Sequence, residues 1–282
     1  METKLIVEIA SSHNGDLELA KALIRAAAEN GADIVKFQDW KAKNVADNDP
    51  DKVRYEKYQF PDEWYGILPE YCKENGVEFL TSCFNAERVV GLAAYGLKKI
   101  KIASVCLTNH DLLIMAGANF DEVIASTAMA TKEQIEEAAD VLASSAKSFT
   151  LMQCVANYPC RSGDTNLLKM NGLREIIEGQ EYASVGYSNH SLDLDVPKTA
   201  IAMGAKYVEV HFSLSRYLPQ IRHQMYAGGP MVTTHEVSLE PHELKELAEW
   251  RDKVALVQGN GEFTINEVEA GIKERYLGRY GK

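Results

Sequence analysis

The chain has 282 residues, of which 46% are hydrophobic and 25% are charged. These proportions are typical of a globular protein and exclude a disordered or collagen-like chain. There are 30 lysines and arginines against 41 aspartates and glutamates, so the formal net charge is −11. We therefore expect no nucleic-acid partner, and any anionic ligand must be held by a local cluster of cations.

The cysteines and the amino-terminal segment indicate the compartment. Five cysteines, an odd number without CxxC spacing, favour reduced thiols in a cytoplasmic protein. No apolar run approaches the roughly 20 residues that a membrane-spanning helix needs. The start, METKLIVEIASSHNG, lacks the cleavage pattern of a signal peptide. We expect a cytoplasmic protein without a membrane partner.

Short apolar runs alternate with amphipathic segments along the whole chain. After the run at 5–9, Ala, Leu and Ile recur every three or four residues over 17–30, where Asn30-Gly31 ends the pattern. The same cycle then repeats. We expect strands at 5–9, 34–37, 78–82, 100–104, 122–126, 150–154, 183–188 and 207–212, and helices at 17–30, 62–75, 86–95, 111–116, 132–145, 167–177, 192–203 and 241–257.

This order of elements predicts an α/β fold with a parallel sheet, because each apolar strand is followed by a helix that covers it. Eight such units within about 250 residues favour a closed (β/α)₈ TIM barrel over an open doubly wound sheet. The first strand is not followed by a glycine-rich phosphate fingerprint, which weakens a dinucleotide-binding alternative. We expect one domain that spans residues 1–282.

Two segments are longer than a barrel loop requires, at 39–60 and 213–238. Both follow a strand, so both are expected at the mouth where TIM barrels carry their active sites. The alternative is a surface excursion without a function. The second segment contains Arg222 and His223, and we expect both to contact substrate.

Polar side chains gather at the predicted carboxyl ends of otherwise apolar strands. In a barrel these ends face one common site. A lone lysine there can extend to solvent and a lone serine can cap a helix, but two lysines in apolar strands favour an anionic substrate that compensates their charge. The polar set is Glu8, Lys36, Gln38, Ser82, Lys101, Ser104, Ser126, Asn157, Tyr158, Ser188, His190, Glu209 and His211.

The two histidines of this set suggest a metal site. His190 and His211 end neighbouring strands, so both imidazoles can reach one ion. Two nitrogen ligands, with the other positions left to water or substrate, suit a divalent catalytic metal. Because the site is poor in thiolate and carboxylate, we expect exchangeable Mn²⁺, with Co²⁺ or Mg²⁺ as alternatives, rather than structural zinc.

At this point the motifs resemble those of a known family, the sialic acid (N-acetylneuraminate) synthases of the NeuB type and their legionaminate, pseudaminate and spore-coat polysaccharide relatives. The resemblance covers essentially the whole chain in the order of the family. It is carried by VEIASSHNGDLELAKALI, GADIVKFQ, KIKIASVCLTN, VIASTAMAT, VGYSNHSLDLDVPKTAIAMGAKYVEVHFSL and SLEPHELKEL. It implies a TIM barrel that uses a divalent metal to join phosphoenolpyruvate (PEP) to the aldehyde of an amino sugar, releasing phosphate and a 2-keto acid.

The resemblance also implies roles for single residues. His190 and His211 resemble the metal ligands, and Glu8 resembles the glutamate near the reacting carbons. Gln38 and Tyr158 resemble sugar contacts. The PEP contacts would be Lys36, Lys101, Ser104, Ser126 and Ser188, with Ser82 where the family usually has threonine. We expect Glu8, Lys36, Lys101 and His211 to be catalytic. We expect Asn157 to contact substrate, together with Gln38, Tyr158 and the four serines named as PEP contacts.

Three departures concern the sugar side of the site. Cys106 stands where the family has a glutamate, and Arg222 replaces an aspartate ahead of His223. The chain also stops where the family's antifreeze-like domain would begin, so we expect the catalytic barrel without it. An aldose or aldose phosphate is the expected acceptor, since arginine pairs well with phosphate or carboxylate. The alternative is that Arg222 is a solvated loop residue.

Two other functions remain open from the sequence. A Schiff-base aldolase would use Lys36 or Lys101 as its nucleophile. A catalytically silent PEP- or sugar-binding homologue would keep the scaffold after losing its acids. Family members associate as dimers, so a homodimer is the expected assembly.

Overall fold

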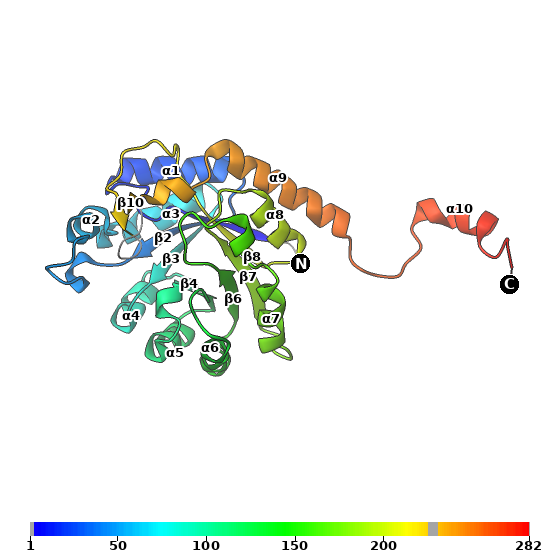
Figure 1. The fold of residues 1–282 in the computed structure, drawn as a ribbon, viewed down its shortest axis with the longest axis horizontal. Helices are drawn as coiled ribbons and strands as arrows, with labels where there is room; N and C mark the ends of the chain where they lie inside the picture. The colour runs from blue at the N-terminus through cyan, green and yellow to red at the C-terminus, as the bar shows by residue number, and fades with distance from the viewer. Residues whose placement is uncertain (1–2, 225–230, 282) are drawn as a thin grey trace.

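The computed structural model describes residues 3–224 and 231–281 (Figure 1). Eight parallel strands form a closed barrel in chain order, and β8 pairs with β1. The predicted TIM barrel is thereby confirmed. The strands are β1 (Lys4–Glu8), β2 (Ile34–Asp39), β3 (Glu78–Cys83), β4 (Lys99–Ile102), β5 (Glu122–Ser126), β6 (Phe149–Cys154), β7 (Ala183–Asn189) and β8 (Tyr207–His211).

Helices surround the barrel and follow its strands (Figure 1). Their ends show local causes: Asp16 accepts from the N–H groups of Glu18 and Leu19 before α1, and Thr131 forms a capping box with Gln134 before α6. The α-helices are α1 (Leu17–Glu29), α2 (Lys52–Tyr58), α3 (Leu68–Glu74), α4 (Ala86–Ala94), α5 (His110–Asn119), α6 (Lys132–Ser145), α7 (Lys169–Ile176), α8 (Asp195–Ala202), α9 (Pro241–Gln258) and α10 (Glu267–Tyr276).

The expected elements are present, and their ends differ by a few residues. The prediction that a strand continues to residue 104 was wrong: β4 ends at Ile102, and Ser104–Cys106 form a 3₁₀ turn. Helix α2 was not predicted within the polar segment 39–60. Its position depends on a tertiary contact, because the buried Tyr58 accepts a hydrogen bond from the Ile221 N–H at 2.9 Å.

The interior of the barrel is layered because inward positions recur every second residue of a strand. An apolar layer fills the middle and consists of Ile6, Ile34, Leu80, Ile124, Met152 and Tyr207. Below it, Glu122 accepts hydrogen bonds from Thr150, Lys206 and Tyr207. Two residues above it, towards the carboxyl ends, the inward positions become polar. The apolar layer is therefore the floor of any site at the mouth.

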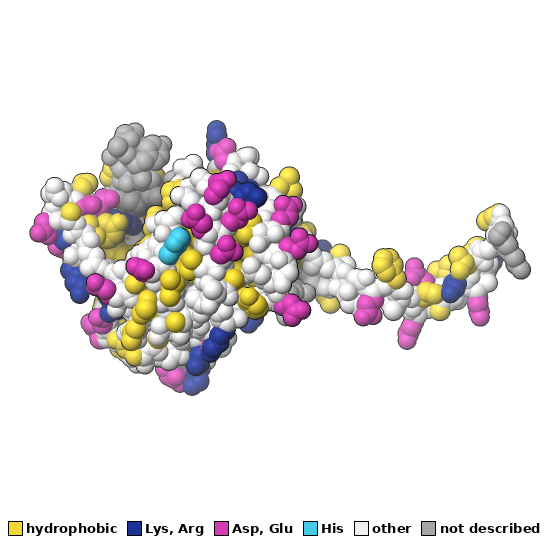
Figure 2. Space-filling view, turned by 90° about the horizontal axis from the view of Figure 1, so that it is seen from below, with side chains coloured by type: hydrophobic (Ala, Val, Ile, Leu, Met, Phe, Trp, Pro, Cys, Tyr) yellow, Lys and Arg dark blue, Asp and Glu magenta, His cyan; other side chains and the backbone are white. Residues whose placement is uncertain are grey.

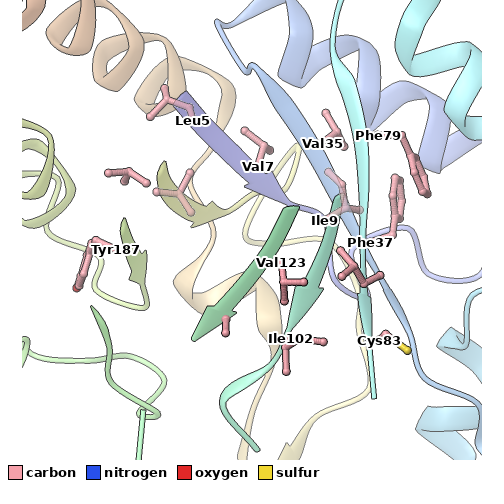
Figure 3. Packing of buried hydrophobic residues seen from close by; sticks show 14 of the residues in the cluster. Leu5, Val7, Ile9, Val35, Phe37, Phe79, Cys83, Ile102, Val123 and Tyr187 are labelled. Atoms are coloured by element: carbon pink, nitrogen blue, oxygen red, sulfur yellow. The ribbon is translucent and has the colours of Figure 1, made fainter. Parts of the chain in front are cut away.

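The residues between these inward positions pack outwards against the helices. Leu5, Val7, Val35, Phe37 and Val123 belong to this second core, which is nearly inaccessible to solvent (Figure 3). Burial on both faces explains why the strands read as continuous apolar runs interrupted at a few inward positions.

After α9 the chain leaves the barrel, and α10 lies apart from it (Figure 1). Hydrophobic side chains are spread along this extension (Figure 2), and they include Phe263, Ile265, Val268, Ile272 and Tyr276. In the part of the chain that the structure describes, no helix is long and apolar enough to span a bilayer.

The tight interior at β7 generates a stability prediction. A Cβ atom added to Gly186 would lie 2.8 Å from the Tyr207 carbonyl oxygen and 3.2 Å from Met152. Because the backbone at Tyr207 belongs to a paired strand, Gly186→Ala should lower the free energy of unfolding by about 1–3 kcal/mol. Gly91→Ala, on exposed α4 with no atom within 4 Å, should raise it by up to about 1 kcal/mol. Urea unfolding measures both, and equal effects would contradict this packing.

Candidate active site

A cavity of about 1070 Å³ opens at the carboxyl ends of the strands. It collects most of the residues that the sequence singled out. Its lining includes Glu8, Lys36, Gln38, Ser82, Lys101, Ser104, Ser126, Tyr158, Ser188, His190, Glu209 and His211. The strand ends therefore form one site, as the barrel requires.

Strand register accounts for the neighbours within this site. Glu8 on β1 pairs with Lys36 on one side and with His211 on the other. Ser188 on β7 pairs with Glu209 on β8. Glu8, Lys36 and Glu209 each lie two positions beyond a residue of the middle layer on the same strand, so their side chains point inwards by the alternation of the strand. His211 lies four positions beyond Tyr207 and points the same way.

Two lysines and two glutamates form an ion-pair network above the apolar floor. Lys36 Nζ lies 2.5 Å from Glu8 Oε2 and 3.1 Å from Glu209 Oε1. Lys101 Nζ lies 3.7 Å from Glu209 Oε2. The four side chains are almost completely buried. Their formal charges sum to zero when all four are ionised.

Burial and the ion pairs within the network shift the pKa values of its members. Burial disfavours the charged forms, but the attraction of Glu209 and Glu8 outweighs it and raises the pKa of Lys36. Burial also opposes ionisation of Glu209, and the two lysines outweigh it and lower the pKa of Glu209 to about 2. For Lys101 burial prevails, so its pKa is lowered. Lys101 is thus the cation with the least compensated charge in the network.

These contacts correct one step of the sequence argument. The buried lysines do not need an anionic substrate for compensation, because Glu8 and Glu209 supply the negative charge within the protein. Glu209 was absent from the predicted catalytic and binding residues, although it lies at the centre of the network. The signal was its place two residues before His211 in an apolar strand, which puts both side chains on the same face.

Serine hydroxyls surround the two ammonium groups. Lys101 donates to Ser126 Oγ at 2.6 Å, and Lys36 lies 3.3 Å from Ser82 Oγ. Ser188 donates to Glu209 at 3.1 Å. Ser104, from the 3₁₀ turn after β4, accepts from the Ala128 N–H at 3.1 Å. Together they offer hydrogen-bond donors around two cations, which is an arrangement suited to phosphate and carboxylate oxygens.

The two imidazoles lie side by side at the ends of β7 and β8. The ring centroids of His190 and His211 are 5.4 Å apart, and Tyr158 stacks on His190 with centroids at 3.8 Å. Burial lowers the pKa of His190 to about 4 and the pKa of His211 well below its usual value. Both rings are therefore neutral near pH 7, as metal-ligating histidines must be.

The donor atoms fit a metal held by two protein nitrogens. His190 Nδ1 lies 2.6 Å from the Val155 carbonyl oxygen, so this nitrogen carries the proton and Nε2 keeps its lone pair. His211 Nδ1 is buried and has no hydrogen-bond partner among the residues that the structure describes. Among residues 3–224 and 231–281, no group of three or more His, Cys, Asp or Glu side chains is arranged around one ion. Any further ligands would come from water or substrate.

One wall of the cavity is aromatic and comes from the segment between β2 and β3. Trp40 donates from Nε1 to Gln38 Oε1 at 3.0 Å, and Gln38 donates to Glu8 at 3.3 Å. Tyr55 packs edge-on against Trp40 with centroids at 5.0 Å. Arg54, next to Tyr55 on α2, also lines this wall. None of Trp40, Arg54 and Tyr55 was among the predicted site residues, although the segment 39–60 that carries them was expected at the mouth.

Two predicted substrate contacts, Arg222 and Asn157, are not among the described residues that line the cavity. Arg222 pairs with Glu236 at 3.0 Å, donates to the Met231 carbonyl oxygen, and leaves 57% of its side chain exposed. The position of Arg222 agrees with the alternative expectation that it is a solvated loop residue. Asn157 is exposed. His223 lies in the short strand β9 (His223–Gln224), and its side chain is outside the described residues.

Cys106, at the position of the family's glutamate, does line the cavity. Burial raises the pKa of its thiol, and Sγ lies 3.6 Å from the Phe84 carbonyl oxygen. The cavity lining therefore has a neutral thiol at the position where the sequence resemblance gives a glutamate.

Comparison with known proteins agrees with this geometry. The NeuB family matches residues 23–263. The chain belongs to the NeuB family. It is 32% identical to the N,N'-diacetyllegionaminic acid synthase of Legionella pneumophila over 95% of this chain and 77% of that one. Identity to the Campylobacter jejuni enzyme of the same name is 33%, over 92% and 78%.

A solved structure shows the same fold. The crystal structure of the N-acetylneuraminic acid synthetase from Leptospira borgpetersenii, in complex with citrate, superposes with a TM-score of 0.86. It is 27% identical, with 98% of this chain and 91% of that chain covered. The resemblance found in the sequence motifs is confirmed, and the chain is an N-acetylneuraminate synthase-like enzyme.

The ion-pair network predicts the cost of removing Glu209. Glu209→Gln should lower the free energy of unfolding by about 3–5 kcal/mol, because Lys101 loses its carboxylate partner in a buried site. Glu18→Gln, which breaks an exposed pair with Lys21, should change it by less than about 1 kcal/mol. Urea denaturation at pH 7 compares the two. A similar small loss for both variants would show that the network is not a buried ionic unit.

His13, in the loop after β1, predicts a pH dependence. It is 2% exposed, packs against Trp64 and accepts from the Gly15 N–H at 3.0 Å. Burial lowers its pKa to about 4. Between about pH 6.5 and pH 4 the imidazole is protonated in the unfolded chain but not in the folded one. The free energy of unfolding therefore decreases as pH falls through this range.

The matching variant is His13→Asn, whose side-chain oxygen can accept from Gly15. The fall in the free energy of unfolding between pH 6.5 and 4.5 should become shallower by up to about 1.4 kcal/mol per pH unit. His110→Asn, at an exposed helix start, is the control. The measurement is urea unfolding at several pH values, and equal slopes for wild type and His13→Asn would refute a neutral buried imidazole.

Proposed function

We propose that the protein condenses PEP with an aldose-type aldehyde, giving a 2-keto-3-deoxy sugar acid and phosphate. The observation that carries the proposal is the convergence of Lys36 and Lys101 with hydroxyl groups on one cavity in a NeuB-family barrel. The names of the relatives support it, since both proteins are N,N'-diacetyllegionaminic acid synthases.

The charges of the site suggest how PEP would bind. Lys101 and Ser126 form the part of the network with the least compensated positive charge, and they would receive phosphate or carboxylate oxygens. Lys36 would exchange part of its contact with Glu8 for the ligand. Ser82, Ser104 and Ser188 would donate hydrogen bonds from the surrounding strand ends. The result is an anion held against a dry apolar floor.

The reaction then balances without any oxidant. The C2=C3 electron pair of PEP forms the new bond to the aldehyde carbon, and the aldehyde oxygen takes up a proton. Water adds to C2 and loses one proton. The C2 hydroxyl so formed gives its remaining proton to the departing phosphate as the C2–O bond breaks and the 2-keto group forms. Glu8 would accept the proton from water once Lys36 turns to the ligand. Such proton transfer contributes about 10²–10⁴-fold to a rate.

His190 and His211 would hold the divalent metal, for which we propose Mn²⁺, with Co²⁺ or Mg²⁺ as alternatives. A bound metal of this kind acts as a Lewis acid on a carbonyl oxygen. The chain's own contribution is to keep both rings neutral by burial and to fix His190 through Val155. Tyr158 covers the His190 ring and limits access of water to this side of the cavity.

One observation favours a second chemistry. Burial lowers the pKa of Lys101, which is also what a Schiff-base nucleophile requires. An aldolase of that kind would need no metal and would form a covalent imine with the carbonyl substrate. Borohydride reduction distinguishes it, since only an imine is trapped on the protein.

Lys101→Met tests the proposed PEP site. Wild-type protein with PEP, Mn²⁺ and a panel of aldoses and aldose phosphates should release phosphate together with a 2-keto acid. In Lys101→Met the affinity for PEP should fall about 10- to 100-fold, because a charge-assisted contact to a buried anion is lost. Lys147→Met, which removes an exposed lysine, is the matched control.

The other functions give different results in the same assay. PEP binding without phosphate release for any acceptor would indicate a silent binding homologue. Borohydride trapping on Lys101 with full activity in EDTA would indicate the aldolase. Loss of turnover in EDTA, restored by Mn²⁺, would support the metal at His190 and His211.

A further inference from the structure

The cations that line the cavity differ in their partners. Lys36 and Lys101 pair with Glu8 and Glu209 in the network described above. Lys41 pairs with Asp39 at 3.1 Å and with Asp62 at 2.8 Å. The fourth Lys or Arg of the lining is Arg54, and no carboxylate oxygen of the described residues lies within 4.0 Å of its guanidinium.

Arg54 is nevertheless partly withdrawn from water. Its Nε atom is buried and has no hydrogen-bond partner among the described residues. Its guanidinium carbon lies 5.6 Å from the centroid of the Tyr55 ring. Burial is the main influence on Arg54 and lowers its pKa. Interactions with Tyr55 and Asp51 only partly oppose the effect of burial. The buried Nε–H is a donor that no described group satisfies, and such a donor is costly unless a ligand meets it.

The location of Arg54 assigns it to the acceptor rather than to PEP. The network that would bind PEP lies inside the barrel, on the strand ends directly above the apolar floor. Arg54 comes from α2, outside the barrel (Figure 1), and shares its wall with Trp40 and Tyr55. A hydrogen-bonded chain from Trp40 through Gln38 to Glu8 joins this wall to the network.

The wall has the composition of a site for a charged sugar. Indole and phenol rings offer apolar faces to sugar C–H groups, and guanidinium binds carboxylate or phosphate with two parallel hydrogen bonds. Asp51 lies on the same wall and attracts Arg54, but it makes no ion pair with it. Cys106, in the 3₁₀ turn after β4, adds a neutral group to the lining of the same cavity.

We propose that Arg54 binds an anionic group of the acceptor, a carboxylate or a phosphate at the end of the sugar remote from its aldehyde. This inference rests on the proposed condensation of PEP with an aldose. It transfers to α2 the anion-binding role that the sequence had suggested for Arg222, which pairs with Glu236 instead. Arg54 is thus a specificity-determining residue of the acceptor site.

Unreactive acceptor analogues test the inference without any turnover. Reduced mannose, reduced mannose 6-phosphate and reduced mannuronate are titrated by calorimetry into protein saturated with PEP and Mn²⁺. One of the two anionic analogues should bind wild type about 10- to 100-fold more tightly than the neutral one. Phosphate and carboxylate are told apart by which analogue is preferred. Arg54→Met should abolish the preference, and Arg54→Lys should keep part of it.

The controls separate this inference from the proposed function. Arg25→Met removes an exposed arginine of α1 and should leave the preference intact. PEP titrations on the same proteins should give an affinity within about threefold of wild type for Arg54→Met, which is under about 1 kcal/mol. Failure of PEP to bind wild type refutes the proposed function itself. Equal binding of the three analogues, binding of none, an anion preference that survives Arg54→Met, or a loss of PEP affinity in that variant overturns the role of Arg54.

Discussion

The site depends on the mutual neutralisation of two lysines and two glutamates in a buried layer of the barrel. The attraction of Glu209 and Glu8 outweighs burial and raises the pKa of Lys36, and the two lysines outweigh burial and lower the pKa of Glu209. This layer rests on an apolar floor that excludes water from below. An anion that enters from the mouth therefore meets cations already in place, in surroundings where their charge is poorly screened.

Because the four charges of the network already cancel, an anionic ligand must replace an existing ion pair rather than add a new one. Glu8 Oε2 is bonded to both Lys36 and Gln38, and its other oxygen accepts from the Ala10 N–H at 2.6 Å. A phosphate that draws Lys36 away leaves Glu8 with fewer donors. Binding of an anion and the contacts of Glu8 are in this way linked through a single lysine.

Much of the fold and part of the site follow from the sequence, because period-two patterns in apolar strands fix which side chains point inwards. The same rule places Glu209 on the inward face, but we predicted no catalytic or binding role for it. Other features depend on contacts between distant segments. Helix α2, and with it Arg54, is held where Tyr58 meets Ile221. Arg222 finds Glu236 within its own segment, and no local pattern distinguishes that pairing from a substrate contact.

The pairing of β1 with β8 joins residues about 200 positions apart in the chain, and Glu8 lies beside His211 only after this seam has closed. During synthesis from the amino terminus, Lys36 and Lys101 emerge long before Glu209, their shared counter-ion. Intermediates that lack β8 would carry these ammonium groups in solvent rather than in a barrel. Closure of the cylinder and assembly of the ion-pair network are consequently one event.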